Sequence, residues 1–130
     1  MRGIFQRRAR RAPILAGLCA SVAGAARGVA AARLAGATRG DARVAGARQL
    51  AIYLQNVTFC ADISTCAALF ARDRATIRHA LARIEDSRDA PADDFALACL
   101  DAALIAQLAM FRDFARAFSS DELEQIDDRN

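Results

Sequence analysis

Arginine and histidine side chains recur at helical spacing between residues 72 and 83, and their chemistry suits the binding of a polyanion. Guanidinium groups bind phosphates, and guanine bidentately, while small side chains between them would let a helix approach a groove closely. A solvated charged face explains the pattern equally well on its own. At about 100° per residue, the expected outer face carries Ala75, Arg78, His79, Ala82 and Arg83, with Arg72 just before it and Arg74 on its flank. The expected core face carries Ile77, Ala80, Leu81 and Ile84.

Two local signals predict the elements that would hold these residues. Asp62 and Asp73 are each placed to accept hydrogen bonds from the free amides of a first helical turn. They predict one helix over residues 62–70 and a second from Asp73 to about residue 86. Residues 71 and 72 leave room only for a sharp corner, as in a helix-turn-helix.

A family resemblance adds to this interpretation. Residues 70–80, FARDRATIRHA, resemble the signature of the C-terminal DNA-binding domain of the bacterial replication initiator DnaA, which reads roughly F-G-G-R-D-H-T-T-V-x-H-A. Residues 47–54, ARQLAIYL, are similar to the A-R-Q-x-A-M-Y-L helix of that family. The resemblance covers about residues 15–86 and is closer still to stand-alone DnaA-like proteins, in which the signature His is commonly Arg. It implies an all-α, Trp repressor-like helix-turn-helix bundle, here with an added long C-terminal helix.

The resemblance also implies a site. It predicts sequence-specific binding of double-stranded DNA by a transcription regulator or an accessory regulator of replication initiation, cytoplasmic and nucleoid-associated. The signature's His and first Thr are replaced by Arg74 and Ala75, so the docking mode carries over but the target sequence does not. Base readout falls to Asp73, Arg74, Ala75 and Thr76, phosphate contacts to Arg48, Arg72, Arg78 and His79, and minor-groove contacts to Arg39 and Arg43 in the preceding loop.

Composition predicts one helical domain with divided charge. The chain has 130 residues, 55% of them apolar, with no Trp and two Pro, which favours an all-helical fold. Through Ile84, 14 Arg against three acidic residues give a net charge of +11; the remainder has four Arg against 12 acids, or −8. The basic part fits a polyanionic partner, and the acidic end cannot face that same partner.

Four segments are expected: a flexible basic arm over residues 1–12, a DNA-binding domain over 13–86, a helix over 87–118 and an acidic tail over 119–130. The basic start followed by an apolar run is also typical of a secretory signal. That run is too short to span a bilayer and coincides with the first core helix implied by the resemblance. A cytoplasmic protein without membrane contact is therefore preferred.

The C-terminal segment is apolar along one stripe. Two interpretations are open for it: the helix folds back across its own domain, or two copies pair as a homodimer through residues 92–118. Ser119 and Glu122 have the spacing of a capping box, and the acidic tail that includes them is expected to be mobile. The stripe consists of Leu97, Leu100, Leu104, Leu108, Phe111, Ala115 and Phe118.

Catalytic and cofactor chemistry is not expected. Cys19, Cys60, Cys66 and Cys99 lack zinc-site spacing, which predicts reduced, apolar thiols and no metal. His79, the only histidine, has no nucleophile paired with it in the sequence. A G-x-x-x-x-G-K-[ST] loop is absent, so nucleotide binding is not expected. The remaining alternative is a helical protein-interaction module, acting through the C-terminal helix, in which DNA binding is weak or lost.

Overall fold

The chain folds entirely into helices over the part that the structure describes. A computed structural model places the backbone of residues 2–36 and 41–127 and the side chains of residues 12–36 and 41–117, and no strand occurs in those backbone ranges. The all-α prediction is confirmed. In order, the elements are α1 (Arg2–Arg27), the 3-10 helix η1 (Ala31–Ala35), α2 (Ala42–Val57), α3 (Ile63–Phe70), α4 (Arg74–Ser87) and α5 (Pro91–Asp127).

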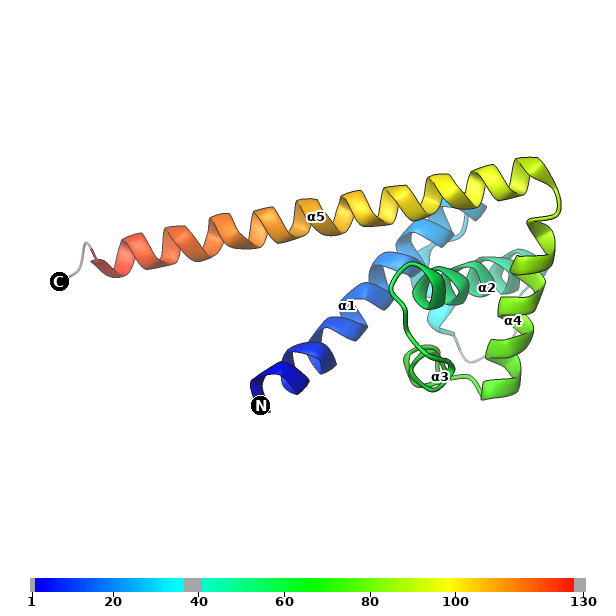
Figure 1. Ribbon diagram of the computed structural model, residues 1–130, viewed down its shortest axis with the longest axis horizontal. Helices are drawn as coiled ribbons and strands as arrows, with labels where there is room; N and C mark the ends of the chain where they lie inside the picture. The colour runs from blue at the N-terminus through cyan, green and yellow to red at the C-terminus, as the bar shows by residue number, and fades with distance from the viewer. Residues whose placement is uncertain (1, 37–40, 128–130) are drawn as a thin grey trace.

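The core lies between α1, α2 and the helices that follow. Helix α2 crosses the centre of the body, with α1 on one side and α3 and α4 on the other (Figure 1). Small residues of α1, among them Cys19 and Ala23, are fully buried against the apolar face of α2. A second cluster joins α2 to α3 and α4 through Ile52, Cys66, Ile77 and Ala80. This second cluster holds α3 and α4 against the body.

Helix α1 ends on glycines for a steric reason. Gly28 has φ +67, a left-handed conformation that glycine adopts without the penalty of a Cβ atom. The amide of Gly28 donates to the carbonyl of Ala25 at 3.4 Å and that of Val29 to Gly24 at 2.8 Å, which is the Schellman pattern. A Cβ atom on Gly24 would collide with the carbonyl oxygen of Val29. The chain can therefore reverse tightly into η1 only with glycine at this end.

The segment boundaries at both ends of the chain were predicted wrongly. The basic stretch before residue 13 was expected to be a flexible arm, but α1 runs without a break from Arg2 through Pro13. The capping-box pattern at Ser119 does not start a new helix, because α5 continues through it to Asp127. The C-terminal helix is therefore 37 residues long and includes most of the segment expected to be an acidic tail.

Three hydrogen bonds set the start of α5 against the body. The Tyr53 hydroxyl donates to Glu85 at 2.7 Å and accepts from Arg88 Nη1 at 2.8 Å, while Arg88 Nε donates to Asp94 at 2.6 Å. Burial raises the pKa of Tyr53, and the hydrogen bond to Tyr53, followed by that to Asp94, raises the pKa of Arg88. Since Tyr53 lies on α2, Glu85 on α4 and Asp94 on α5, this network fixes the corner between the last two helices.

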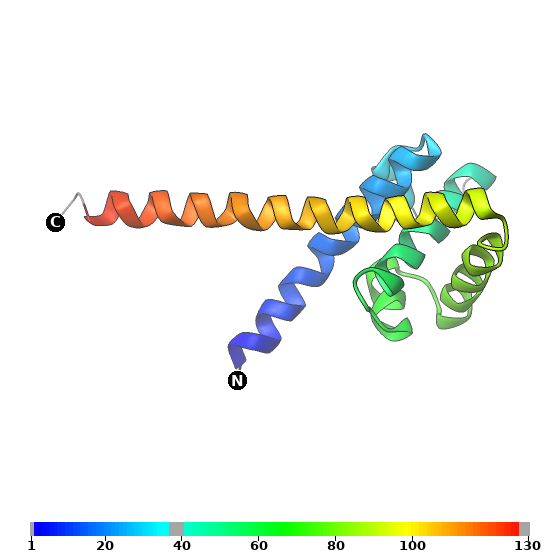
Figure 2. The ribbon, with the colours of Figure 1, turned by 45° about the horizontal axis from the view of Figure 1, so that its top comes forward.

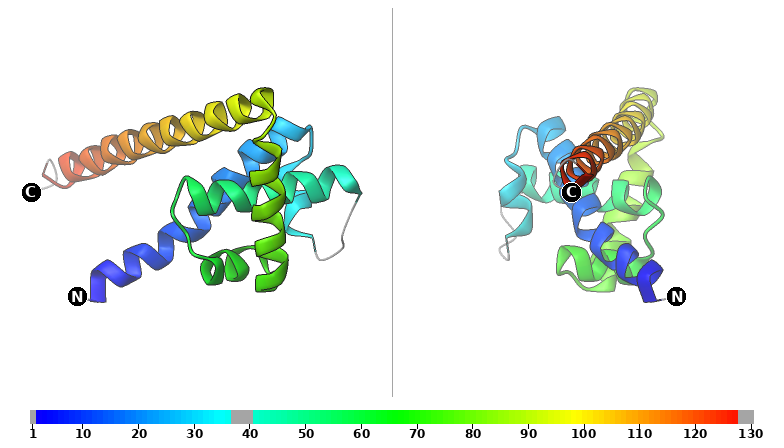
Figure 3. Two further views of the ribbon diagram at one scale, coloured as in Figure 1. Left: turned by 45° about the vertical axis from the view of Figure 1, so that its right-hand side comes forward. Right: turned by 90° about the vertical axis from the view of Figure 1, so that its left-hand side faces the viewer.

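Beyond that corner, α5 leaves the body. Leu97 and Leu104 are buried, and Leu100 is half-buried, so the first turns pack mainly on α1. From Ile105 to Ala117 no described side chain is buried. Figures 2 and 3 show this part of α5 and the first half of α1 projecting from the same side of the body and diverging.

Candidate nucleic-acid interface

Helices α3 and α4 are joined by a corner that local chemistry dictates. Asp73 caps α4 by accepting a hydrogen bond from the amide of Thr76 at 2.7 Å, as expected from the sequence. Hydrogen bonds from the Thr76 side chain and amide lower the pKa of the Asp73 carboxyl, which keeps it ionised at the positive end of the helix. Ala71, at the end of α3, has φ 50 and ψ 48, so the chain turns through a left-handed residue.

The outer face of α4 is basic and accessible, as predicted. Arg74, Arg78, His79 and Arg83 are all exposed, with Ala75 and Ala82 between them. None of the four forms a hydrogen bond or ion pair with any side chain in the described ranges 12–36 and 41–117. From Arg74 to Ile84 the helix carries no acidic residue. The opposite face, with Ile77, Ala80 and Ile84, is buried as predicted.

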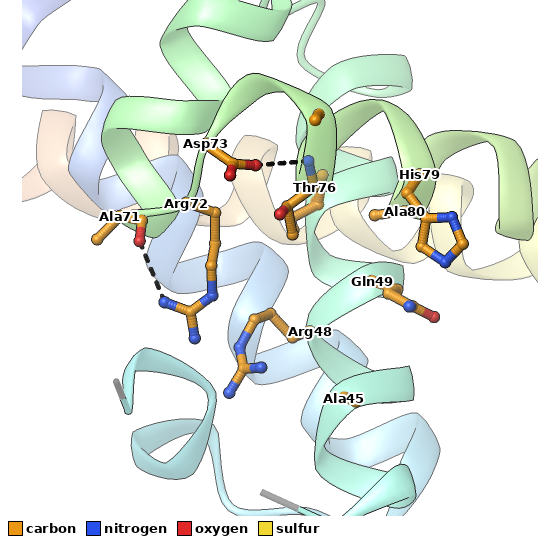
Figure 4. A pocket seen from close by; sticks show the side chains of 11 residues that line it. Ala45, Arg48, Gln49, Ala71, Arg72, Asp73, Thr76, His79 and Ala80 are labelled. Carbon is orange, nitrogen blue, oxygen red and sulfur yellow. Dashed lines mark hydrogen bonds between the residues drawn. The ribbon is translucent and has the colours of Figure 1, made fainter. Parts of the chain in front are cut away.

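A surface hollow of about 800 Å³ lies between the start of α4 and the middle of α2. Figure 4 shows Arg72, Asp73, Thr76 and His79 coming from the corner and α4 on one side of it, and Arg48 and Gln49 coming from α2 on the other. The other lining residues include four with small side chains, which leave space between the polar groups: Ala45, Ala71, Ala75 and Ala80. Its shape brings together most of the residues that the sequence singled out.

Arg48 lies in this hollow but is not the exposed phosphate clamp that was expected. Its side chain is only 7% exposed, and its Nε donates to the carbonyl of Leu34 at 2.9 Å. Nη2 of Arg48 is buried without a hydrogen-bond partner. Burial, and then the nearby Arg72 guanidinium, lower the pKa of Arg48. The structure thus gives Arg48 the role of anchoring the end of η1 to α2.

Arg72 holds the same segment from the other side. Its Nη2 donates to the carbonyl of Gly36 at 2.7 Å, and its Nη1 donates to that of Ala71 at 3.1 Å. Two arginines therefore donate hydrogen bonds to the carbonyls of Leu34 and Gly36, directly before residues 37–40. This arrangement holds Gly36 beside the corner between α3 and α4.

The two residues expected to enter a minor groove have different outcomes. Arg39 lies outside the residues that the structure describes. Arg43 is exposed, but it belongs to the first turn of α2 rather than to the loop. Asp41 caps α2 by accepting from the amide of Val44 at 3.0 Å, and that hydrogen bond is the main cause of its lowered pKa. Helix α2 therefore starts earlier than predicted, because Asp41 caps it.

Two of the four cysteines are buried and two are exposed. Cys19 and Cys66 are buried, and burial raises the pKa of Cys19 to about 12 and that of Cys66 to about 11, so both thiols stay protonated at neutral pH. Cys60 and Cys99 are exposed, and all four cysteines are free thiols. Among the side chains the structure describes, no three His, Cys, Asp or Glu residues are grouped as metal ligands.

Sequence reasoning missed one residue of the hollow. Gln49 lines it from α2, next to Arg48 (Figure 4). It stands inside the A-R-Q motif, so the signal was present but was used only for Arg48. A glutamine amide can donate to and accept from a base or a phosphate.

The chain was also compared with known proteins. No protein family, no curated protein and no solved structure matched it. The functional conclusion therefore depends on the geometry and chemistry of the site itself.

Proposed function

We propose that this protein binds double-stranded DNA sequence-specifically through a DnaA-type helix-turn-helix, with α4 in the major groove. The observation that carries the proposal is the outer face of α4. Four basic side chains stand there exposed, with alanines among them, and none of the four forms a hydrogen bond or ion pair with another described side chain. Exposed arginines that protein groups do not neutralise are available to phosphates and base edges.

Base readout is assigned to the first turn of α4. Arg74 is exposed at the first helical position and can donate two parallel hydrogen bonds to guanine O6 and N7. Ala75 follows it and can contact a thymine methyl group. Thr76 is exposed too, although its amide is already used by the cap. Asp73 keeps its place in the proposed base-reading turn, and its cap ensures that this turn is formed before DNA arrives.

Phosphate contacts are assigned to Arg78, His79 and the face around the hollow. Arg72 stays half-exposed while gripping Gly36, so its guanidinium can serve the protein and a phosphate together. Arg48 lies behind it and holds the carbonyl of Leu34 at the end of η1. Each phosphate neutralised should add about 0.9 to the log–log dependence of affinity on salt concentration.

The regulatory role follows from what such a domain can do by itself. DNA binding without nucleotide chemistry can repress, activate or compete at a site, and it can do so at a promoter or at a replication origin. We therefore propose a transcription regulator or an accessory regulator of replication initiation, acting in the cytoplasm on the nucleoid.

Selection of bound sequences from a random duplex pool tests the proposal. We expect an enriched site, and we expect Arg74→Ala to relax the preference at one base pair, at a cost of about 1–3 kcal/mol. Ser64→Ala on the exposed side of α3 is the matched control and should leave the selected site unchanged. A pool that shows no enrichment, at a salt concentration where binding is measurable, would contradict sequence-specific recognition.

One observation favours a second candidate, a protein-interaction module. Several large apolar side chains of α5 are exposed, including Met110 and Phe111. If they are the functional surface, DNA binding is weak or lost, and the chain should not retard mixed genomic DNA in a gel at moderate salt. Retardation that Arg78→Glu abolishes would favour the DNA-binding proposal instead.

A further inference from the structure

The apolar face that packs α5 on the body continues beyond the body. Leu97, Leu104 and Phe111 are seven residues apart and so lie on nearly one line along the helix. Leu97 and Leu104 are buried, whereas Phe111 is 56% exposed, although it lies on the same line one heptad later. Met110, beside it, is 70% exposed. The contact between α5 and α1 therefore ends before Phe111, although the apolar face of α5 that forms it continues through Phe111.

Charge indicates what would cover this face. Helix α1 contains six Arg and no acidic residue, which gives +6, with five of the arginines before Pro13. Helix α5 contains eight acidic residues and two Arg, which gives −6; its part beyond Leu104 has five acidic residues and two Arg, which gives −3, and four of those acids follow residue 120. The two helices touch only near the body and then diverge (Figures 1 and 3). Within one chain, the basic start of α1 and the acidic end of α5 are thus directed apart.

A membrane fits this helix less well than a protein does. The most apolar 18-residue window within Pro91–Ala117 has a mean hydropathy of 1.7, and the helix is long enough to cross a bilayer. A transmembrane position would pull buried Leu97 and Leu104 out of the core and bring Asp101 into hydrocarbon, where an acidic group costs about 2.5–3.5 kcal/mol at the centre. A net charge of −6 also repels the anionic lipids that attract surface helices.

We infer that two copies of this chain pair reciprocally, with the projecting part of α5 of each copy lying along the first half of α1 of the other. Phe111 and its apolar neighbours then leave water, and each acidic helix meets a basic one. The pairing is symmetric, because the same two surfaces are used twice. It leaves the outer face of α4 uncovered, and it does not depend on the function proposed above.

Sedimentation velocity of the full chain tests the pairing. We expect a species of twice the 13.9 kDa chain mass that dissociates on dilution. Added salt should promote dissociation, because opposite charges attract less when they are screened. A monomer at all concentrations, or a dimer that salt strengthens, would overturn the proposal. So would monomers that float with vesicles of phosphatidylcholine and phosphatidylserine.

A matched pair of variants locates the contact. Phe111→Asp places a charge on the apolar face and should raise the dimer dissociation constant about tenfold or more. Ala109→Asp adds the same charge to an exposed position on the other side of α5 and should change it far less. Both side chains are exposed, so circular dichroism should report an unchanged helix content for both. If both variants change the dimer dissociation constant equally, the face of α5 that includes Phe111 is not the contact surface.

Cross-linking distinguishes this arrangement from two α5 helices lying together. In chains with Cys60→Ser and Cys99→Ser, one copy carries Ala12→Cys on α1 and the other carries Ala115→Cys on α5. We expect a short bismaleimide to link the two different chains when they are mixed, as read from the mass of the product. Links only between two copies of the Ala115→Cys chain would overturn the reciprocal pairing.

Discussion

Helices α3 and α4 both begin with an Asp cap, but the side chains that they expose differ in charge. Asp62 accepts from the amide of Thr65 at 2.7 Å, and Asp73 accepts from that of Thr76, also at 2.7 Å. Helix α3 then shows small neutral residues such as Ser64 and Ala68 to solvent, while α4 shows arginines. The cap thus indicates where a helix starts but does not indicate the function of that helix. The difference in charge is what marks α4 as the candidate recognition helix.

The largest expected effect concerns what the two helices share. Ile77 of α4 and Cys66 of α3 are both fully buried in the cluster against α2. Ile77→Ala removes three buried carbon atoms and should lower the free energy of unfolding by about 2–5 kcal/mol in urea titrations. Cys66→Ala removes a single sulfur atom and should cost less. An Ile77→Ala protein as stable as the original would show that α4 does not depend on this cluster.

The next effect addresses what separates the helices. Arg78→Glu reverses a charge on the outer face of α4 and should weaken binding to a selected duplex by about 10–100-fold, or about 1–3 kcal/mol. Ala68→Glu puts the same negative charge on the exposed side of α3 as a control. Fluorescence anisotropy with a labelled duplex measures both. If the two variants weaken binding equally, the contrast between the helices has no functional meaning.

A smaller effect concerns the residue that joins them. Ala71 has a positive φ, which costs an L-residue with a Cβ atom about 1–2 kcal/mol. Ala71→Gly removes that strain, partly offset by the greater freedom of glycine when unfolded, and should stabilise the protein by up to about 1 kcal/mol. Ala68→Gly, inside α3, should destabilise it by about 1 kcal/mol. Thermal melts of both variants should therefore shift in opposite directions.

The smallest expected effect tests whether Asp62 and Asp73 both stabilise their helices as ionised caps. Hydrogen bonds from Thr65 and Thr76 hold the pKa values of Asp62 and Asp73 below the ordinary value, and Arg74 adds to the shift at Asp62. A carboxyl with a lowered folded-state pKa contributes stability above its unfolded value of about 3.9 and loses it as the pH falls through the folded pKa. The melting temperature should therefore fall less from about pH 5 to about pH 3 in an Asp62→Asn, Asp73→Asn double variant. Identical pH profiles would contradict the capping role.

Local chemistry explains why this pair of helices could be predicted. An Asp at the N-cap position marks a helix start within one turn, and the apolar spacing of Ile77, Ala80 and Ile84 determines the buried face. Both were predicted correctly, to within one residue at the starts of α3 and α4. Neither signal needs information from a distant part of the chain.

The parts that could not be predicted depend on distant partners or on competing local signals. Arg48 is buried because η1 presents the carbonyl of Leu34 to it, and nothing near Arg48 in the sequence encodes that carbonyl. The pattern at Ser119 is a weak start signal inside a run of good helix formers, so the helix continues through it. The contacts of the candidate site with DNA stay a prediction, since recognition depends on a partner as well as on the chain.

Nuclear magnetic resonance of the isotopically labelled chain, titrated with a selected duplex, tests the central claim most directly. We predict that the backbone amide signals of Arg74, Arg78 and Arg83 shift strongly, while those of Ser64, Ala68 and the outer part of α5 shift little. Saturation with duplex that leaves the α4 signals in place, or that moves only those of α5, would contradict the assignment of α4 to the major groove.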